Sequence, residues 1–538
     1  MTTETKAVGG AAAPPVPPAR WPRFTLLFLV FSSGVAVMGL EMSASRLIAP
    51  YFGTTLSVWT SLIGLVLLFL TVGYYLGGAL ADRFPTRAAL GAIVLIAGFI
   101  SLALPLFSGA VLAAAWKLTP KLGILGGSFV GTFALFLAPM VLLGCVCPFA
   151  MKLSIMDLGR TGRTSGRIYA ISAVGSVVGT FLPAMVTIPT LGVRHSIMLF
   201  GAILVVAALL LLARLRFLPA AGALALFAVP LQALLPARGV IASRESAYNY
   251  LQVVQIPVGE ATFRRMLIVD WGGFSVYQPG AFRTDEYYDY LLLAPLLRDR
   301  PPFEWLHRVL IIGLGAGTAS KQITECYGPV EIDGVEIDPA IVDLGRKLFE
   351  MTEPNLRVHV TDGRAFLASA REPYDWVIVD AYQGSDIPFH LTTKEFFKEL
   401  RGHMSPGGVL SVNVACWTPD DHELLDRLET TVATAFPRIA VLPGISERSG
   451  AVLLAGGEDF AVRNLVPNAA GVGHPGLWEI VAQVRAPEPP DLVLVARRPT
   501  AGPGVLTDDR APVEEIADRM YRERRRLAFE RERAVLGL

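Results

Sequence analysis

Residues 308–317 read RVLIIGLGAG, and residues 330–338 read VEIDGVEID. The first stretch predicts a buried strand, Arg308–Ile312, which ends in a glycine turn and is followed by a helix over Thr318–Tyr327. The second stretch predicts another strand, which ends in the acidic residue Glu336. Strands that alternate with helices in this way are typical of a parallel α/β sheet, in which ligands bind at the carboxyl ends of the strands.

The glycine turn and the acid that follows it predict a nucleoside site. Gly313, Gly315 and Gly317 allow the backbone to approach a ligand closely and to turn into a helix N-terminus. Glu336 lies 23 residues after Gly313, at the end of the next predicted strand, where a carboxylate can accept both hydroxyls of a ribose. The last glycine of the dinucleotide-binding pattern is missing, which favours an S-adenosyl compound over NAD.

The same pattern continues along the chain and supplies further acids at strand ends. Asp362 follows a third predicted strand, Leu356–Val360, and Asp380 follows a fourth, Trp376–Val379. Because the carboxyl ends of parallel strands meet at one edge of a sheet, these carboxylates should lie close together. The remaining predicted elements of this half are a fifth strand at 408–414, a small antiparallel β-unit at 244–280 and a helix at 285–297.

Together these pieces resemble the spermidine synthase (polyamine aminopropyltransferase) family. The resemblance covers about 240–415 and implies a class I methyltransferase-like sheet behind a small β-domain. The stretch Leu506–Val513 also resembles the tail of bacterial members that are fused to a multi-pass membrane region. The matching motifs are Glu245–Tyr248 (ESAY), Gln278, Thr284–Glu286 (TDE), Gly313–Gly317 (GLGAG), Val335–Asp338 (VEID), Asp362–Gly363 and Asp380.

The resemblance implies a role for each matched residue. Asp380 would be the catalytic residue beside the attacking amine, which would also contact Asp285, Tyr382 and Asp386. No metal ligands and no permanently bound cofactor are expected, because the sulfonium compound is a co-substrate. The residues that would bind this co-substrate, decarboxylated S-adenosylmethionine, are Gln278, Gly313, Gly315, Gly317, Glu336, Asp362 and Gly363.

A carboxylate at Asp380 suits the reaction that the resemblance implies. The sulfonium carbon is already electrophilic, whereas an amine with a lysine-like pKa of about 10 is mostly protonated at neutral pH. A carboxylate at the strand end can orient the ammonium group and accept its proton. Holding the two reactants in line would then supply most of the acceleration.

The sequence departs from the family pattern where the charges of a diamine would be bound. Ala316 stands in place of an aspartate in the glycine turn, and Gln383 replaces a second carboxylate after Asp380. Three functions therefore stay open. They are aminopropyl transfer to an amine with release of methylthioadenosine, methyl transfer from S-adenosylmethionine to a lipid or small amphiphile, and a non-catalytic transporter or sensor with a nucleoside- or polyamine-binding domain.

The N-terminal half of the chain predicts a membrane domain. Of the 538 residues, 53% are hydrophobic and 17% charged, which excludes a disordered chain, a disulfide scaffold and a strongly basic nucleic-acid binder. Residues 1–237 carry 15 Lys and Arg against 4 Asp and Glu, whereas the rest carries 32 against 42. Apolar runs long enough to cross a bilayer predict about seven spans, at 24–45, 57–80, 88–113, 125–150, 168–190, 195–213 and 217–236.

The predicted architecture is an all-α transmembrane bundle followed by a Rossmann-like α/β domain. The cysteines form no disulfide framework, and reduced thiols are expected. Glu41 and Arg46 lie at a membrane end, where charge is a functional hypothesis. The predicted units are a disordered tail at 1–23, the membrane domain at 24–237, the β-domain with a linker helix at 240–300, and the α/β domain at 301–538 with a charged C-terminal helix over Val513–Val535.

Two arguments disagree about orientation in the membrane. The loops richer in Lys and Arg alternate along the chain and should be cytoplasmic, so seven spans would leave the α/β domain outside. A cytosolic co-substrate instead favours a cytoplasmic catalytic domain, which we adopt, with a segment such as 217–236 re-entrant or lying flat. The expected partners are a small amine and the lipid bilayer, without nucleic acid, and a homodimer is left open.

Overall fold

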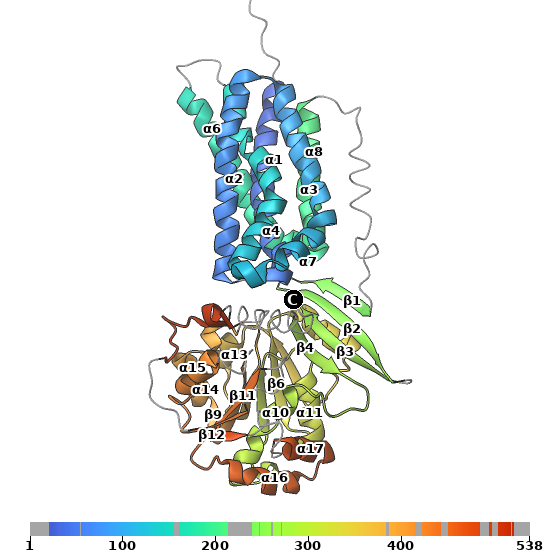
Figure 1. Ribbon diagram of the computed structural model, residues 1–538, viewed down its shortest axis with the longest axis vertical. Coiled ribbons are helices and arrows are strands. Elements are labelled where there is room, and N and C mark those ends of the chain that lie inside the picture. The colour runs from blue at the N-terminus through green and yellow to red at the C-terminus, as the bar shows by residue number, and fades with distance from the viewer. Residues whose placement is uncertain are drawn as a thin grey trace, which may run out of the picture.

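The computed structural model consists of a helical bundle stacked end to end on an α/β domain, with a small antiparallel sheet beside their junction (Figure 1). It describes residues 21–520 apart from a set of gaps. The predicted span 217–236, most of the predicted tail, Asp386 and the predicted C-terminal helix beyond residue 520 lie outside the described residues. The gaps are 54, 155–160, 213–238, 247, 260–261, 271, 383–386, 415–421, 443–449, 485–493, 498–503 and 518.

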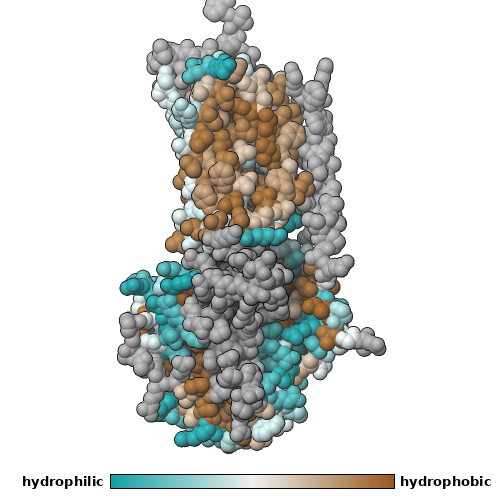
Figure 2. Space-filling model, in the orientation of Figure 1, coloured by the Kyte–Doolittle hydropathy of each residue, from teal (hydrophilic) through white to brown (hydrophobic). Residues whose placement is uncertain are grey.

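Six helices of the described part of the chain are long and apolar enough to cross a membrane, and the first six predicted spans coincide with them. Large apolar side chains on these helices are exposed, such as Phe181 (58% exposed) and Met185 (73%), which is the surface expected of helices that face lipid. Figure 2 shows the bundle as a brown, apolar band. The helices are α1 (Trp21–Phe52), α2 (Leu56–Arg83), α3 (Arg87–Trp116), α4 (Thr119–Gly144) with α5 (Val146–Ser154), α6 (Thr161–Leu182) with a π-helical turn (Pro183–Thr187) and α7 (Ile188–Leu191), and α8 (Val193–Leu211).

Glycines bring the helices of the bundle into backbone contact. A Cβ atom at Gly175 of α6 would lie 2.3 Å from the carbonyl oxygen of Phe31 in α1, and one at Gly73 of α2 would lie 2.3 Å from that of Val141 in α4. Small residues are the usual means by which membrane helices pack closely, because lipid tails are as apolar as large side chains. The bundle interior therefore depends on these glycines as much as on its apolar side chains.

The α/β domain is built on an eight-stranded mixed sheet of order β12-β10-β11-β9-β8-β5-β6-β7. The five predicted parallel strands are confirmed as β5 to β9, and Ile312 at the end of β5 pairs with Val335 of β6 and Val379 of β8. Three strands that we did not predict extend the sheet in antiparallel fashion. The strands are β5 (Arg308–Ile312), β6 (Glu331–Glu336), β7 (Leu356–Val360), β8 (Tyr374–Val379), β9 (Met404–Val414), β10 (Arg438–Leu442), β11 (Ala451–Gly456) and β12 (Val495–Arg497).

Helices cover both faces of this sheet, so its central strands β5, β8 and β11 are largely buried and apolar. The carboxyl ends of β5, β6 and β8 consequently form one edge, as the sequence predicted. The helices are α11 (Thr318–Tyr327), α12 (Pro339–Leu348), α13 (Gly363–Ser369), α14 (Lys394–Gly402), α15 (Glu423–Val432), α16 (Leu465–Val472) and α17 (Pro475–Gln483).

The predicted β-unit is a four-stranded antiparallel sheet, which begins slightly earlier than expected. The helix predicted at 285–297 is confirmed in part: the helical segment Tyr288–Leu297 starts later and consists of one turn of α-helix, α10 (Tyr288–Leu291), and a 3-10 turn (Ala294–Leu297). Pro295 has no amide hydrogen and therefore cannot continue an α-helix through this buried segment. The strands of the β-unit are β1 (Val240–Glu245), β2 (Tyr250–Val258), β3 (Thr262–Val269) and β4 (Gly272–Tyr277).

The β-unit joins the bundle to the α/β domain. Arg46, near the end of α1, donates a hydrogen bond to the carbonyl oxygen of Tyr248. The carboxylate of Glu245 accepts a hydrogen bond from the amide of Val193, at the start of α8. The α/β domain is thus attached at the end of the bundle where α1 finishes and α8 begins (Figure 1).

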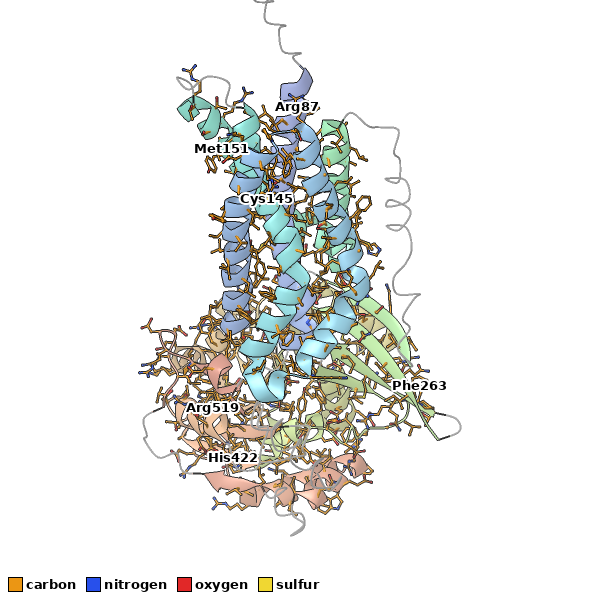
Figure 3. The ribbon with its side chains drawn as sticks, turned by 45° about the horizontal axis from the view of Figure 1, so that its top comes forward. Arg87, Cys145, Met151, Phe263, His422 and Arg519 are labelled. Carbon is orange, nitrogen blue, oxygen red and sulfur yellow. The ribbon has the colours of Figure 1, made fainter. Side chains whose placement is uncertain are left out.

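The opposite end of the bundle carries most of the described basic residues next to the spans. Figure 3 shows Arg87 and Met151 at that end, far from Phe263 and Arg519 of the other domains. We call it the arginine-rich end, and define it by Arg83, Arg87, Lys152, Arg163 and Arg167.

Candidate active site

A pocket of about 180 Å³ lies between the carboxyl edge of the sheet and the β-unit. We call it the sheet pocket. It is lined by loops that follow β5, β6, β7 and β8, and by side chains of β3 and β4. The predicted site residues that it brings together are Gly313, Gly315, Glu336, Asp362, Gly363, Asp380 and Tyr382.

The glycine turn after β5 requires glycine for two physical reasons. Gly313 and Gly315 have φ angles of 92° and 59°, which L-residues other than glycine rarely adopt. A Cβ atom at Gly313 would also lie 2.3 Å from the carbonyl oxygen of Asp380. The turn therefore brings the end of β5 into direct contact with the end of β8.

Glu336 lies at the end of β6 and is only 7% exposed. Its two carboxylate oxygens accept hydrogen bonds from the amides of Asp338 at 3.0 Å and Gly315 at 2.9 Å. Burial raises the pKa of Glu336, and these amides oppose that effect. The carboxylate is thus held in a defined orientation next to the glycine turn.

Asp380 is half-buried at the end of β8 and lines the sheet pocket. One carboxylate oxygen accepts from the side-chain amide of Asn413 at 2.8 Å, and the other accepts from the hydroxyl of Tyr287 at 3.0 Å. Removal from bulk water raises the pKa of Asp380 to about 7, although both hydrogen bonds favour the charged form. A carboxyl group with this pKa can bind and release a proton near neutral pH.

Tyr287 and Asn413 are site residues that the sequence analysis missed. Asn413 follows Val412 of β9, which pairs with Val379 of β8, so the register places it beside Asp380. A polar amide side chain near the carboxyl end of a largely apolar predicted strand was the available signal. Burial raises the pKa of Tyr287 well above its ordinary value, so this hydroxyl stays a hydrogen-bond donor.

Asp362 lines the same pocket and also caps α13. One oxygen accepts from the amides of Arg364 and Ala365 at 3.0 Å, and the other is 3.0 Å from Nε2 of His390. Burial alone would raise the pKa of Asp362, but these amides and the His390 ring lower it below its usual value. Asp362 therefore remains an anion, and His390 is a further residue of the pocket lining.

The predicted residues Gln278, Gly317 and Asp285 are not brought into the sheet pocket. Gln278 and Gly317 line a separate, smaller cavity at the N-terminus of α11. Asp285 is exposed and pairs with Arg283 at 2.7 Å. The acid that is buried in this segment is instead Asp289, four residues later. Sequence spacing could not distinguish these two acids.

The stretch Leu506–Val513 packs back onto the α/β domain. Both side-chain oxygens of Asp508 accept hydrogen bonds from Arg364 at 2.9 Å, and Oδ1 also accepts from Thr393 at 2.6 Å. Arg364 in addition donates to the carbonyl oxygen of His390 at 3.1 Å. The tail thus supports the loop that carries His390 at the edge of the sheet pocket.

Comparison with known proteins shows what this domain is similar to. Residues 297–445 match the model of the spermine/spermidine synthase domain. We call the α/β domain the synthase domain, after the family model that it matches. The matched residues of this synthase domain include the glycine turn, Glu336, Asp362 and Asp380.

Curated relatives cover different parts of the chain. A probable polyamine aminopropyl transferase of Bifidobacterium longum is 38% identical over 193 residues, which are 36% of this chain and 41% of that protein. The chain thus spans less than half the length of this relative, and 48% of a Vibrio vulnificus polyamine aminopropyltransferase that is 35% identical over 150 residues. Polyamine aminopropyltransferase 2 of Streptomyces coelicolor is 28% identical over 537 residues, which are 91% of each chain.

A solved structure resembles part of the chain. A probable spermidine synthase from Corynebacterium glutamicum aligns with a TM-score of 0.40 and 18% identity, and covers 50% of this chain and 96% of that one.

Proposed function

We propose that the synthase domain transfers an aminopropyl group from decarboxylated S-adenosylmethionine to an amine. The observation that carries the proposal is the Asp380 carboxylate, which faces the sheet pocket between the Tyr287 hydroxyl and the Asn413 amide. A general base needs a pKa near the working pH, and the pKa of Asp380 is raised to about 7.

The nucleoside would lie across the ends of β5 and β6. Each oxygen of Glu336 accepts one amide hydrogen and keeps a lone pair for a ribose hydroxyl. Ile337, which is 41% exposed, and Ile341 offer an apolar surface beside it that suits a purine ring. Asp362 lies at the next strand end and could accept a hydrogen bond from the adenine amino group.

The amine nitrogen would attack the methylene carbon that is bonded to the sulfonium sulfur. The carbon–sulfur bond breaks, its electron pair stays on sulfur, and methylthioadenosine leaves. The proton that the amine loses passes to Asp380. Because the sulfonium is already a good leaving group, the protein contributes mainly by aligning the reactants and deprotonating the amine.

A product assay tests the proposal. The purified full chain is incubated with a panel of amines and either decarboxylated S-adenosylmethionine or S-adenosylmethionine, and the nucleoside products are measured by mass spectrometry. We expect methylthioadenosine from the decarboxylated compound and only in the presence of an amine. S-adenosylhomocysteine would instead indicate a methyltransferase, and binding without any product would indicate a non-catalytic domain.

We also propose that the synthase domain lies in the cytoplasm, since an adenosyl sulfonium is a permanent cation that does not cross a bilayer unaided. The loop charges favour the opposite side, because the synthase domain is attached away from the arginine-rich end. The two arguments disagree about the side of the membrane on which the synthase domain lies, and a direct measurement can decide between them.

Cysteine labelling provides that measurement. In a cysteine-free background, Glu372→Cys marks the synthase domain and Asp82→Cys marks the arginine-rich end, at side chains that are both 71% exposed. We expect a membrane-impermeant maleimide to label Asp82→Cys in intact cells and Glu372→Cys only after permeabilisation. The reverse pattern would place the synthase domain outside, as the loop charges favour.

A further inference from the structure

A second and larger cavity, of about 590 Å³, lies where the bundle meets the β-unit. We call it the junction cavity. The bundle contributes the end of α1, the last third of α3 and the start of α8, and the β-unit contributes β1, the turn before β2 and the turn after β3. The cavity is thus at the level where the spans end, and none of the residues assigned above to the transfer reaction lines it.

The junction cavity is lined by charged side chains of both signs. Arg46 and Arg194 come from α1 and α8, and Glu245 and Asp270 come from the β-unit. Within the described part of the chain, Arg194 has neither an ion pair nor a hydrogen bond. The lining therefore carries two positive and two negative groups, and the charge of Arg46 acts on Asp270 as that of Arg194 acts on Glu245.

Asp270 is held toward the cavity by its backbone. Its φ angle of 55° is unusual for a residue other than glycine, and one carboxylate oxygen accepts from the amide of Tyr250 at 3.1 Å. Burial raises the pKa of Asp270 to about 6, an effect that the positive charge of Arg46 only partly offsets. A bound cation near this carboxylate would stabilise its charged form further.

The charge pattern selects among classes of ligand. A simple anion would meet the two carboxylates, and a simple cation would meet the two guanidinium groups, so each would be attracted by one pair and repelled by the other. A zwitterion can contact both pairs favourably. Apolar lining from the end of the bundle, including Leu47, Pro50 and Leu112, adds an apolar wall that suits the start of an acyl chain.

We propose that the junction cavity binds the headgroup of a zwitterionic aminophospholipid, with the phosphate at Arg46 and Arg194 and the ammonium at Asp270 and Glu245. Guanidinium groups are well suited to phosphate oxygens, and the rings of Tyr51, Tyr248 and Tyr250 add surfaces for the ammonium group. Tyr248 and Asn249 line both the junction cavity and the sheet pocket. A bound headgroup would therefore lie one layer of side chains away from the candidate active site.

Lipid binding to the full chain tests this proposal, whether or not the chain transfers an aminopropyl group. Native mass spectrometry of the detergent-purified protein is used to compare phosphatidylethanolamine with anionic phosphatidylglycerol. We expect phosphatidylethanolamine to bind at concentrations about tenfold lower. Soluble glycerophosphoethanolamine at the same concentration should not displace the lipid, and displacement would indicate a site for a soluble zwitterion instead.

Two variants locate the site. Arg194→Gln and Asp270→Asn should each weaken phosphatidylethanolamine binding about tenfold, because each removes one charge from the lining. The asparagine keeps the oxygen that accepts from Tyr250, and a thermal melt verifies that each variant is folded. The matched controls, Arg87→Gln and Asp82→Asn at the arginine-rich end, should bind like the wild type. Equal binding of the two lipids, or wild-type binding by folded Arg194→Gln and Asp270→Asn, would overturn the proposal.

Discussion

Asp380→Asn is expected to lower kcat/KM for aminopropyl transfer by about 10²- to 10⁴-fold, the usual contribution of a general base. The amide keeps the shape of the carboxylate and can still contact Tyr287 and Asn413, but it cannot accept the proton of the amine. Binding of the nucleoside, measured by calorimetry, should stay within a fewfold of the wild type. A variant with full activity would remove Asp380 from the mechanism.

The pH dependence of kcat/KM tests the role of Asp380 as a general base independently. Because burial raises the pKa of Asp380 to about 7, the base is protonated below neutral pH, and kcat/KM should rise as the pH increases through about 7. Tyr287→Phe removes a hydrogen bond to the charged form, so this limb should move to higher pH by about one unit. In Asp380→Asn the limb should be absent.

Stability provides the control for the Asp380 variant. The folded state holds the proton of Asp380 more tightly than the unfolded state does, since the pKa rises from 3.8 to about 7 on folding. Ionisation across that window therefore costs stability as the pH rises. A neutral asparagine should keep or raise the Tm at pH 8, and a lower Tm would mean that lost activity reflects misfolding.

Glu336→Gln should weaken binding of the adenosyl sulfonium about 10- to 100-fold, because hydrogen bonds from ribose hydroxyls to a carboxylate are replaced by bonds to a neutral amide. Calorimetry with the full chain measures the change in Kd. The variant should fold, since the amide oxygen can still accept from Gly315 or Asp338. Undiminished affinity would show that the nucleoside lies elsewhere.

Asp333→Asn is the matched control for Glu336. It lies three residues earlier on the same strand, is 6% exposed and lines no part of the sheet pocket. Its carboxylate pairs with Arg308 at 3.0 Å, so the change should lower stability and leave the Kd of the nucleoside unaltered.

The sequence could predict the sheet edge because strand ends follow directly from local pattern. Gly313, Glu336, Asp362 and Asp380 each come at the end of a predicted strand, and parallel pairing brings such ends together whatever the loops do. The predictions that failed concern residues whose positions depend on tertiary packing. Asp285 and Asp289 look alike in sequence, and only the packing of their turn buries the second.

The antiparallel strands β10 to β12 and the Asn413 side chain illustrate the same limit. The strands follow the last predicted strand, 408–414, at sequence distances that no helix–strand alternation specifies. Asn413 becomes a site residue only through the register between β8 and β9, which places its side-chain amide 2.8 Å from the carboxylate of Asp380. The junction cavity is likewise formed by residues far apart in the chain, such as Arg46 and Asp270.

The hydrogen bond from Arg46 to the Tyr248 carbonyl has a mechanical consequence. Tyr248 forms part of the wall of the sheet pocket, so this wall is tethered to a helix whose tilt depends on the thickness of the surrounding bilayer. A thinner or thicker membrane would change the tilt of α1, move Tyr248 through this hydrogen bond and alter the width of the sheet pocket. Turnover measured in detergent and in vesicles of different chain length would then differ, even with identical chemistry at Asp380.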